Sequence, residues 1–173
     1  MFPPKIKKIV TKKDKQKIVC LTAYSKNVAE ILDNHCDIVL VGDSLGSVLY
    51  NYNSTRKVSL KTMIEHSKSV KMGIKKNLMV VDMPYRTYRN PREALKNAKY
   101  VISQTGCDAV KLEGGKKIVN IIKHLVDRGI PVMGHVGLLP QSSTRFKLKG
   151  KNFIQRKKIF EDAIAISNSG VFA

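Results

Sequence analysis

Ionisable and hydroxyl-bearing residues recur where short apolar runs of the chain end. The residues with this placement are Asp43, Ser44, Asp82, Lys111, Glu113 and His135. Carboxylate oxygens are preferred ligands of Mg²⁺, which also keeps coordination positions for substrate oxygens, whereas three carboxylates alone in a small volume repel one another. If the runs end at one edge of a sheet, the pattern predicts a divalent metal site for a small anionic substrate, where the metal polarises a carbonyl and stabilises an enolate.

Each of these residues also has a purely structural interpretation. Asp43 and Asp82 could cap turns, because glycine or proline lies close to each. Lys111 and Glu113 have the same side-chain parity and could form an ion pair, and His135 could be a core histidine whose hydrogen bonds are satisfied. Convergence of all of them at one edge favours a functional site. Because the chain has no Cys-x-x-Cys pair and no histidine cluster, zinc is a weaker candidate than Mg²⁺.

Five short apolar runs, rich in β-branched residues, predict the strands that position these side chains. They are Ile18–Tyr24, Ile38–Asp43, Leu78–Met83, Ala109–Glu113 and Pro131–Val136. Nearly continuous apolarity is typical of strands that are buried on both faces of a parallel sheet.

The segments between the strands have helical signatures. Asn90 is a good N-cap, proline follows it at the first helical position, and Gly106 ends the apolar stripe of this helix. Ser59 is predicted to cap an earlier helix, and Lys116–Arg128 and Ile154–Ser169 show similar periodicity.

Alternating strands and helices imply right-handed βαβ units and a parallel sheet. An open doubly wound sheet is disfavoured, because no Gly-x-Gly-x-x-Gly motif follows the first strand. We therefore predict an α/β fold of the (βα)₈ TIM-barrel type, truncated after about five βα units and the start of a sixth strand at residues 170–173. A basic N-terminal segment, residues 1–17, precedes a single domain of residues 18–173 that forms the partial barrel. In such a barrel the active site lies at the carboxyl ends of the strands.

The chain carries a net charge of +19, from 32 Lys and Arg against 13 Asp and Glu. A nucleic-acid-binding surface is one interpretation of this charge. The excess is mostly Lys spread along the chain, without interleaved Arg and aromatic residues, so we expect a solvated basic surface and no nucleic-acid partner.

The expected compartment is a reducing cytoplasm. No apolar run reaches the roughly 18 residues of a membrane-spanning helix, and the N-terminal segment lacks the apolar core of a signal peptide. The three cysteines are scattered and odd in number, which does not support a disulfide framework. We expect Cys20 and Cys107 to be small buried hydrophobic residues.

Several short motifs together resemble the ketopantoate hydroxymethyltransferase family. They are Leu21–Tyr24, Val41–Gly46, Val81–Pro84, Val110–Gly115, Gly134–Leu138 and Pro140–Ser142, in the order and spacing of that family. The resemblance covers the chain from about residue 18 to its end. It implies a (βα)₈ barrel and transfer of a hydroxymethyl group from 5,10-methylenetetrahydrofolate to 3-methyl-2-oxobutanoate, giving 2-dehydropantoate in pantothenate biosynthesis.

The resemblance also implies roles for individual residues. Asp43, Asp82 and Glu113 would be the Mg²⁺-site residues, and Asp43, Ser44, Asp82 and Lys111 would contact the small 2-oxo acid, with His135 in a supporting position. The family's glutamate base is expected beyond Ala173, so no residue of this chain is assigned that role. Family members tend to form homo-oligomers. The segment Ser143–Lys151 is shorter and more basic than the usual Gly-rich loop at this position.

Two other functions are compatible with the same sequence features. One is a metal-dependent oxo-acid lyase or mutase of the phosphoenolpyruvate mutase and isocitrate lyase group, which also uses enolate chemistry. The other is an inactive, truncated barrel whose exposed sheet edges bind a partner or nothing.

Overall fold

Five short strands pair side by side in the order in which they occur along the chain. The computed structural model describes residues 2–143 and 146–173, so two residues of the basic segment 143–151 lie outside the described part. The strands are β1 (Cys20–Thr22), β2 (Ile38–Val41), β3 (Leu78–Asp82), β4 (Ala109–Glu113) and β5 (Val132–His135). All four pairings are parallel, in the order β1-β2-β3-β4-β5. Among the described strands the order never reverses, which confirms the parallel α/β arrangement and differs from the reversed strand order of a doubly wound sheet.

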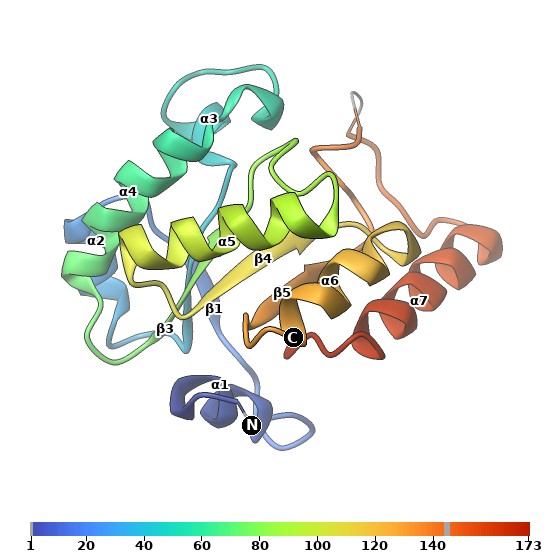
Figure 1. Ribbon diagram of the computed structural model, residues 1–173, viewed down its shortest axis with the longest axis horizontal. Coiled ribbons are helices and arrows are strands. Elements are labelled where there is room, and N and C mark those ends of the chain that lie inside the picture. Colours follow the sequence, from blue (N-terminus) through green and yellow to red (C-terminus); the bar gives the residue numbers. More distant parts are fainter. Residues whose placement is uncertain (1, 144–145) are drawn as a thin grey trace.

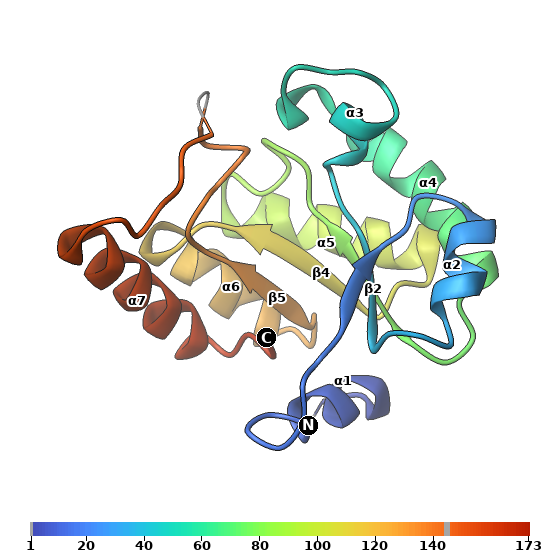
Figure 2. The same ribbon diagram turned by 180° about the vertical axis from the view of Figure 1, so that it is seen from behind.

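Helices and two 3₁₀ turns connect these strands. They are α1 (Pro4–Val10), α2 (Lys26–Leu32), α3 (Leu45–Val48), η1 (Thr55–Lys57), α4 (Leu60–Gly73), α5 (Pro91–Thr105), η2 (Lys116–Ile118), α6 (Val119–Val126) and α7 (Phe153–Ser167). Figure 1 shows α4, α5 and α6 side by side in front of the sheet, whereas Figure 2 shows the opposite face of the sheet with α1 below it.

The main hydrophobic core lies between the sheet and its helices. Alternate strand residues such as Val39, Val81 and Val110 are fully buried there. They pack with apolar residues from the helices, among them Met63 of α4 and Ala98 of α5. Side chains alternate between the two faces of a strand. Since Val39, Val81 and Val110 face the helices, the alternate residues, which include Asp82, Lys111 and Glu113, face the other side of the sheet.

A second apolar cluster closes the amino-terminal end of that opposite face. Ile6 and Ile9 of α1 are buried there against Ile38, Leu78 and other strand residues. Lys5 reinforces the contact, since its Nζ donates to the Asn77 carbonyl at 2.8 Å. The sequence indicated only a basic segment here, and the division of the chain at residue 17 remains a prediction; the structure places residues 4–10 against the sheet.

The predicted helix ends are confirmed where a cap is visible. Ser59 Oγ accepts from the Thr62 amide at 3.0 Å at the start of α4, and Asn90 Oδ1 accepts from the Glu93 amide at 2.9 Å at the start of α5. Gly106 ends α5 with φ +63°, a left-handed conformation that favours glycine.

Two predictions about the first strand are wrong. β1 is shorter than residues 18–24 and is exposed along its length, and Cys20 is exposed rather than buried. The physical reason is that β1 is an edge strand of the described sheet, paired only with β2, so solvent reaches it. Cys107 is buried, as predicted.

The expected start of a sixth strand is supported by backbone hydrogen bonds. The Phe172 amide donates to the Val132 carbonyl at 3.0 Å, and the Gly134 amide donates to the Ala173 carbonyl at 2.8 Å. The chain therefore returns to the edge of β5 after α7. None of the helices in the described ranges combines the length and apolarity needed to span a membrane.

Candidate active site

The strand register places Asp82, at the end of β3, directly beside Lys111 of β4. Lys111 Nζ donates to Asp82 Oδ1 at 2.7 Å, and both side chains are largely buried. Lys111 therefore pairs with a carboxylate of the neighbouring strand, and the suggested ion pair with Glu113 of its own strand is wrong. A buried pair of this kind holds a positive charge at a defined point of the sheet edge.

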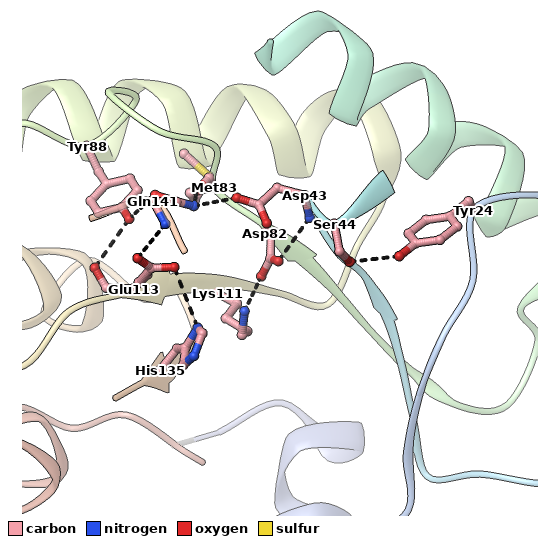
Figure 3. Close-up of polar contacts among 10 residues, drawn as sticks. All are labelled: Tyr24, Asp43, Ser44, Asp82, Met83, Tyr88, Lys111, Glu113, His135 and Gln141. Atoms are coloured by element: carbon pink, nitrogen blue, oxygen red, sulfur yellow. Dashed lines mark hydrogen bonds and ion pairs between the residues drawn. The ribbon is translucent and has the colours of Figure 1, made fainter. Parts of the chain in front are cut away.

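Asp43 follows β2 and lies next to Asp82. Its backbone amide donates to Asp82 Oδ2 at 3.1 Å, so Asp82 is held from both sides (Figure 3). Burial, together with the negative charge of Asp82, raises the pKa of Asp43 to about 6. Ionisation of Asp43 is therefore costly at this buried position beside Asp82.

Glu113, at the end of β4, is paired in register with His135 at the end of β5. Glu113 Oε2 lies 3.8 Å from His135 Nδ1. Burial, followed by the charge of Asp43, raises the pKa of Glu113 to about 7. Burial and the positive charge of Lys111 lower the pKa of His135, so its ring is neutral near pH 7.

His135 is not the satisfied core histidine considered from the sequence. Its Nδ1 atom is buried and has no hydrogen-bond partner among the described residues. A buried polar atom that lacks a hydrogen-bond partner is uncommon and costs free energy, and Glu113 Oε2 lies just beyond hydrogen-bonding distance of this atom.

Gln141 connects the carboxylates, although its type and position did not mark it as a site residue. Its Nε2 donates to Asp43 Oδ2 at 2.8 Å and to the Met83 carbonyl at 3.0 Å, and its backbone amide donates to Glu113 Oε1 at 2.8 Å. Tyr88 donates its hydroxyl hydrogen to Gln141 Oε1 at 2.5 Å. In Figure 3 this side chain lies between Glu113 and Asp43 and joins the ends of β2 and β4 in one network.

The sequence offered one weak signal for Gln141. The residue belongs to the Pro140–Ser142 motif of the family resemblance, but it lies in a loop after β5 and not at a strand end. Only the structure shows that its side chain is 5% exposed. A buried amide requires partners for both its donors and its acceptor. Here Asp43 and the Met83 carbonyl accept from the amide nitrogen, and the Tyr88 hydroxyl donates to the amide oxygen. Arg56 Nε fixes the backbone by donating to the Gln141 carbonyl at 2.7 Å.

Ser44 lies at the exposed side of the network. Its Oγ is 2.7 Å from the Tyr24 hydroxyl, and its side chain points away from Glu113 in Figure 3. The structure therefore brings Asp43 and Lys111 each into contact with Asp82, connects Glu113 to Asp43 through Gln141, and leaves Ser44 at the rim.

The predicted three-carboxylate metal set is not assembled in this arrangement. In residues 2–143 and 146–173, no three His, Cys, Asp or Glu side chains lie close enough together to hold a metal ion. The residues nevertheless fit a hard cation chemically, because Asp43 and Asp82 are adjacent, buried and oxygen-bearing. The assignment of Asp43, Asp82 and Glu113 to a Mg²⁺ site stays a prediction.

Comparison with known proteins identifies the family. The family model described as "Ketopantoate hydroxymethyltransferase" matches residues 4–173. A protein of Pelagibacter ubique named 3-methyl-2-oxobutanoate hydroxymethyltransferase is 63% identical over 98% of this chain and 66% of its own length. Relatives with the same name from Anaplasma marginale and Rhizobium etli are 51% and 47% identical, over 95% and 100% of this chain and 60% and 64% of theirs. The chain thus spans between 60% and 66% of the length of these relatives.

Solved structures with the same fold are far more distant in sequence. Phosphonopyruvate hydrolase, in a complex with oxalate and Mg²⁺, matches with a TM-score of 0.72 at 12% identity, over 99% of this chain and 61% of that one. A 2,3-dimethylmalate lyase of the PEP mutase/isocitrate lyase superfamily matches with a TM-score of 0.68 at 12% identity, over 96% and 61%. These likenesses support the fold alone, whereas the sequence relatives and the family model show that the chain belongs to the ketopantoate hydroxymethyltransferase family.

Proposed function

We propose that this chain takes part in transfer of a hydroxymethyl group from 5,10-methylenetetrahydrofolate to 3-methyl-2-oxobutanoate, giving 2-dehydropantoate. The observation that carries the proposal is the buried network of Asp43, Asp82, Lys111, Glu113 and Gln141 at the carboxyl ends of β2 to β5. It combines one fixed positive charge with carboxylates whose ionisation a cation would favour. The names of relatives that are 47–63% identical support the same activity.

We further propose that the five strands are part of a (βα)₈ barrel. The chain-order parallel sheet and the return of residues 172–173 to the edge of β5 support this architecture. In a barrel the carboxyl ends of all strands face one cavity, so the network would line the floor of the substrate site.

Mg²⁺ would be held by Asp43, Asp82 and Glu113. Burial and mutual repulsion raise the pKa of Asp43 and of Glu113, and a divalent cation among the carboxylates would offset both effects. When bound, the ion would supply Lewis-acid stabilisation of negative charge on the substrate oxygens. The Mg²⁺ and oxalate in phosphonopyruvate hydrolase, which has this fold, are consistent with such a site.

The chain's own residues would bind and orient the oxo acid. Lys111 Nζ, already fixed on Asp82, would offset the charge of the substrate carboxylate, and Ser44 would bind from the rim. His135, neutral near pH 7, would line the pocket beside Glu113.

The chemistry balances as a carbon–carbon bond formation. The C3 proton of the oxo acid leaves to a base, and C3 bonds to the methylene carbon of the folate. Both carbon–nitrogen bonds to that carbon break; the hydroxyl group of one water bonds to the carbon, and two protons, one from the water and one equivalent to the C3 proton, go to the two folate nitrogens. No residue of this chain is assigned as the base. Self-association is part of the proposal, as expected for the family.

The experiment compares the 173-residue chain with a chimera in which it is joined to the unmatched remainder of the Pelagibacter ubique relative. We expect folate-dependent formation of 2-dehydropantoate by the chimera, loss of this activity in Asp82→Asn, and retention in the surface control Lys7→Gln. Lyase activity on a larger oxo acid, without dependence on folate, would instead favour the phosphoenolpyruvate mutase and isocitrate lyase alternative. A correctly folded chimera with neither activity would contradict the proposal.

A further inference from the structure

A cavity lies beside Glu113 and Gln141, which both form part of its wall. It measures about 480 Å³ and is bounded by the loop after β3, the loop after β4 and helix α7. A neighbouring cavity of about 330 Å³ shares part of its wall, including Gly115, Lys158 and Asp162. The larger cavity falls in the roughly 300–1,000 Å³ range of pockets that hold small organic ligands.

The walls of the two cavities are strongly basic. The cationic residues are Arg86, Arg89, Lys116, Lys117, Lys149 and Lys158, against two acidic residues, Glu113 and Asp162. Two of the cations are already paired, Arg89 with Glu93 and Lys116 with Glu161. In the part of the chain that the structure describes, the other four form no ion pair with an acidic side chain.

The two acidic residues are turned to other partners. Glu113 Oε1 accepts from the backbone amides of Gln141 and Ser142. Asp162 Oδ1 accepts from the Lys116 amide at 2.8 Å. Both carboxylates therefore stabilise the loops that form the cavity, and the net positive charge remains available to a ligand.

Two guanidinium groups lie close to an aromatic ring that lines the larger cavity. Arg56 Cζ is 4.8 Å and Arg86 Cζ is 5.2 Å from the centroid of the Tyr85 ring. Arg86 adopts φ +65°, a left-handed backbone conformation that is costly for a residue with a side chain. The strained turn thus positions an arginine at the cavity wall, where a flexible lysine would hold its charge less firmly.

We propose that this basic cavity binds the anionic glutamyl tail of the folate co-substrate, an inference that rests on the proposed function. Gln141 and Glu113 separate the cavity from Asp82 and Lys111, so a folate that brings its one-carbon unit to the oxo acid would extend outward over Lys117 and Lys158. Each added γ-linked glutamate brings one more carboxylate. Lys117, Lys149 and Lys158 carry positive charges that are not paired with acidic side chains of the described residues, and their long side chains can meet carboxylates at more than one spacing.

The test measures binding of tetrahydrofolate with one or with three glutamates to the 173-residue chain, by isothermal titration at 50 mM and 200 mM salt. We expect the triglutamyl form to bind about tenfold more tightly at low salt, because two further carboxylates meet two free lysines, and this advantage falls as salt screens it. Lys117→Gln with Lys158→Gln should reduce the advantage to about twofold or less, and the corresponding arginine pair should restore it.

The matched control removes two positive charges from the opposite end of the sheet, through Lys7→Gln with Lys13→Gln. It should keep the full triglutamate advantage. Equal affinity for both folates in the unsubstituted chain, or an equal loss in the control, would overturn the inference. Competition by inorganic phosphate as effective as that by free γ-triglutamate would also overturn it, because the cavity would then take any multivalent anion.

The two proposals fail separately. If the chimera forms no 2-dehydropantoate but the triglutamate advantage depends on Lys117 and Lys158, the proposed reaction is contradicted and the proposed binding of the glutamyl tail is supported. Product formation with no preference for the triglutamyl folate would do the reverse.

Discussion

Replacement of Gln141 by leucine tests whether this buried amide supports the carboxylate network. Leucine has a similar volume but leaves Asp43 Oδ2, the Met83 carbonyl and the Tyr88 hydroxyl without the partner that Gln141 provides. The backbone bond to Glu113 is kept, because any residue donates it. The substitution therefore removes only the side-chain part of the network.

The magnitude follows from the charge of the acceptors. A hydrogen bond to an ionised carboxylate contributes about 1.5–3 kcal/mol and a neutral one about 1 kcal/mol. Because the bonds are not independent, we expect Gln141→Leu to lower the free energy of unfolding by about 3 kcal/mol at pH 7. The bond from Gln141 lowers the pKa of Asp43, which is nevertheless raised to about 6, so Asp43 is mostly ionised at pH 7 and mostly protonated at pH 5.

The loss should therefore be smaller at pH 5, about 1–2 kcal/mol, because the bond to Asp43 is then one to a neutral carboxyl group. Urea unfolding at the two pH values measures both quantities. Gln104→Leu, the same change at an exposed position of α5, is the control and should stay within about 0.5 kcal/mol of the unsubstituted chain. A loss for Gln141→Leu that is identical at pH 5 and pH 7, or no larger than that of the control, would refute the assigned contacts.

Three further predictions concern the carboxylates and the N-terminal helix. Asp43→Asn should stabilise the chain by about 1–3 kcal/mol at pH 7 and little at pH 4. The reason is that the pKa of Asp43 is raised to about 6 in the folded state, so the carboxyl group favours the folded state below its unfolded pKa near 4 and loses that contribution as the pH rises through 6. Urea unfolding across this pH range checks the sign, and stabilisation confined to low pH would contradict it. Lys111→Met should cost about 3–5 kcal/mol at pH 7, because it leaves the buried Asp82 carboxylate unpaired; a cost below 1 kcal/mol would mean that Asp82 is solvated. Ile6→Ala should cost about 2–4 kcal/mol, because Ile6 is fully buried beneath the sheet; a negligible change in the urea midpoint would show that residues 4–10 are dispensable.

Strands β2 to β5 and the ends of helix α5 could be predicted because local signals determine them. Pro91 after Asn90, and Gly106 at the end of the same helix, satisfy conformational and hydrogen-bonding needs that are independent of the rest of the chain. The bounds of β4 agree with the sequence pattern, since its alternate residues face a core on one side and the site on the other. The exposure of β1 could not be predicted, because it depends on what lies beside the strand and not on its own composition.

The composition of the site was predictable only where strand ends bring residues together. The register of β3 and β4 places Lys111 beside Asp82. The sequence predicts that these strands pair but not which residues lie opposite each other. Helix α1 was missed because its seven residues carry three lysines and only a short apolar stripe, a pattern that a solvated segment shares. Its two isoleucines are buried only because the sheet packs against them.

Gln141 shows why a carboxylate-based search is incomplete. A site that holds several buried carboxylates needs neutral donors to stabilise them when no cation is bound, and an amide supplies two N–H groups without adding charge. Lysine at this position would neutralise Asp43 permanently and compete with a metal ion, whereas leucine would leave the carboxylate unsolvated. The amide keeps Asp43 hydrogen-bonded, with a pKa near 6, so that it still gains from a cation. The residue that best explains the electrostatics of this network is therefore one that carries no charge, and its backbone connects the network to the cavity beside Glu113.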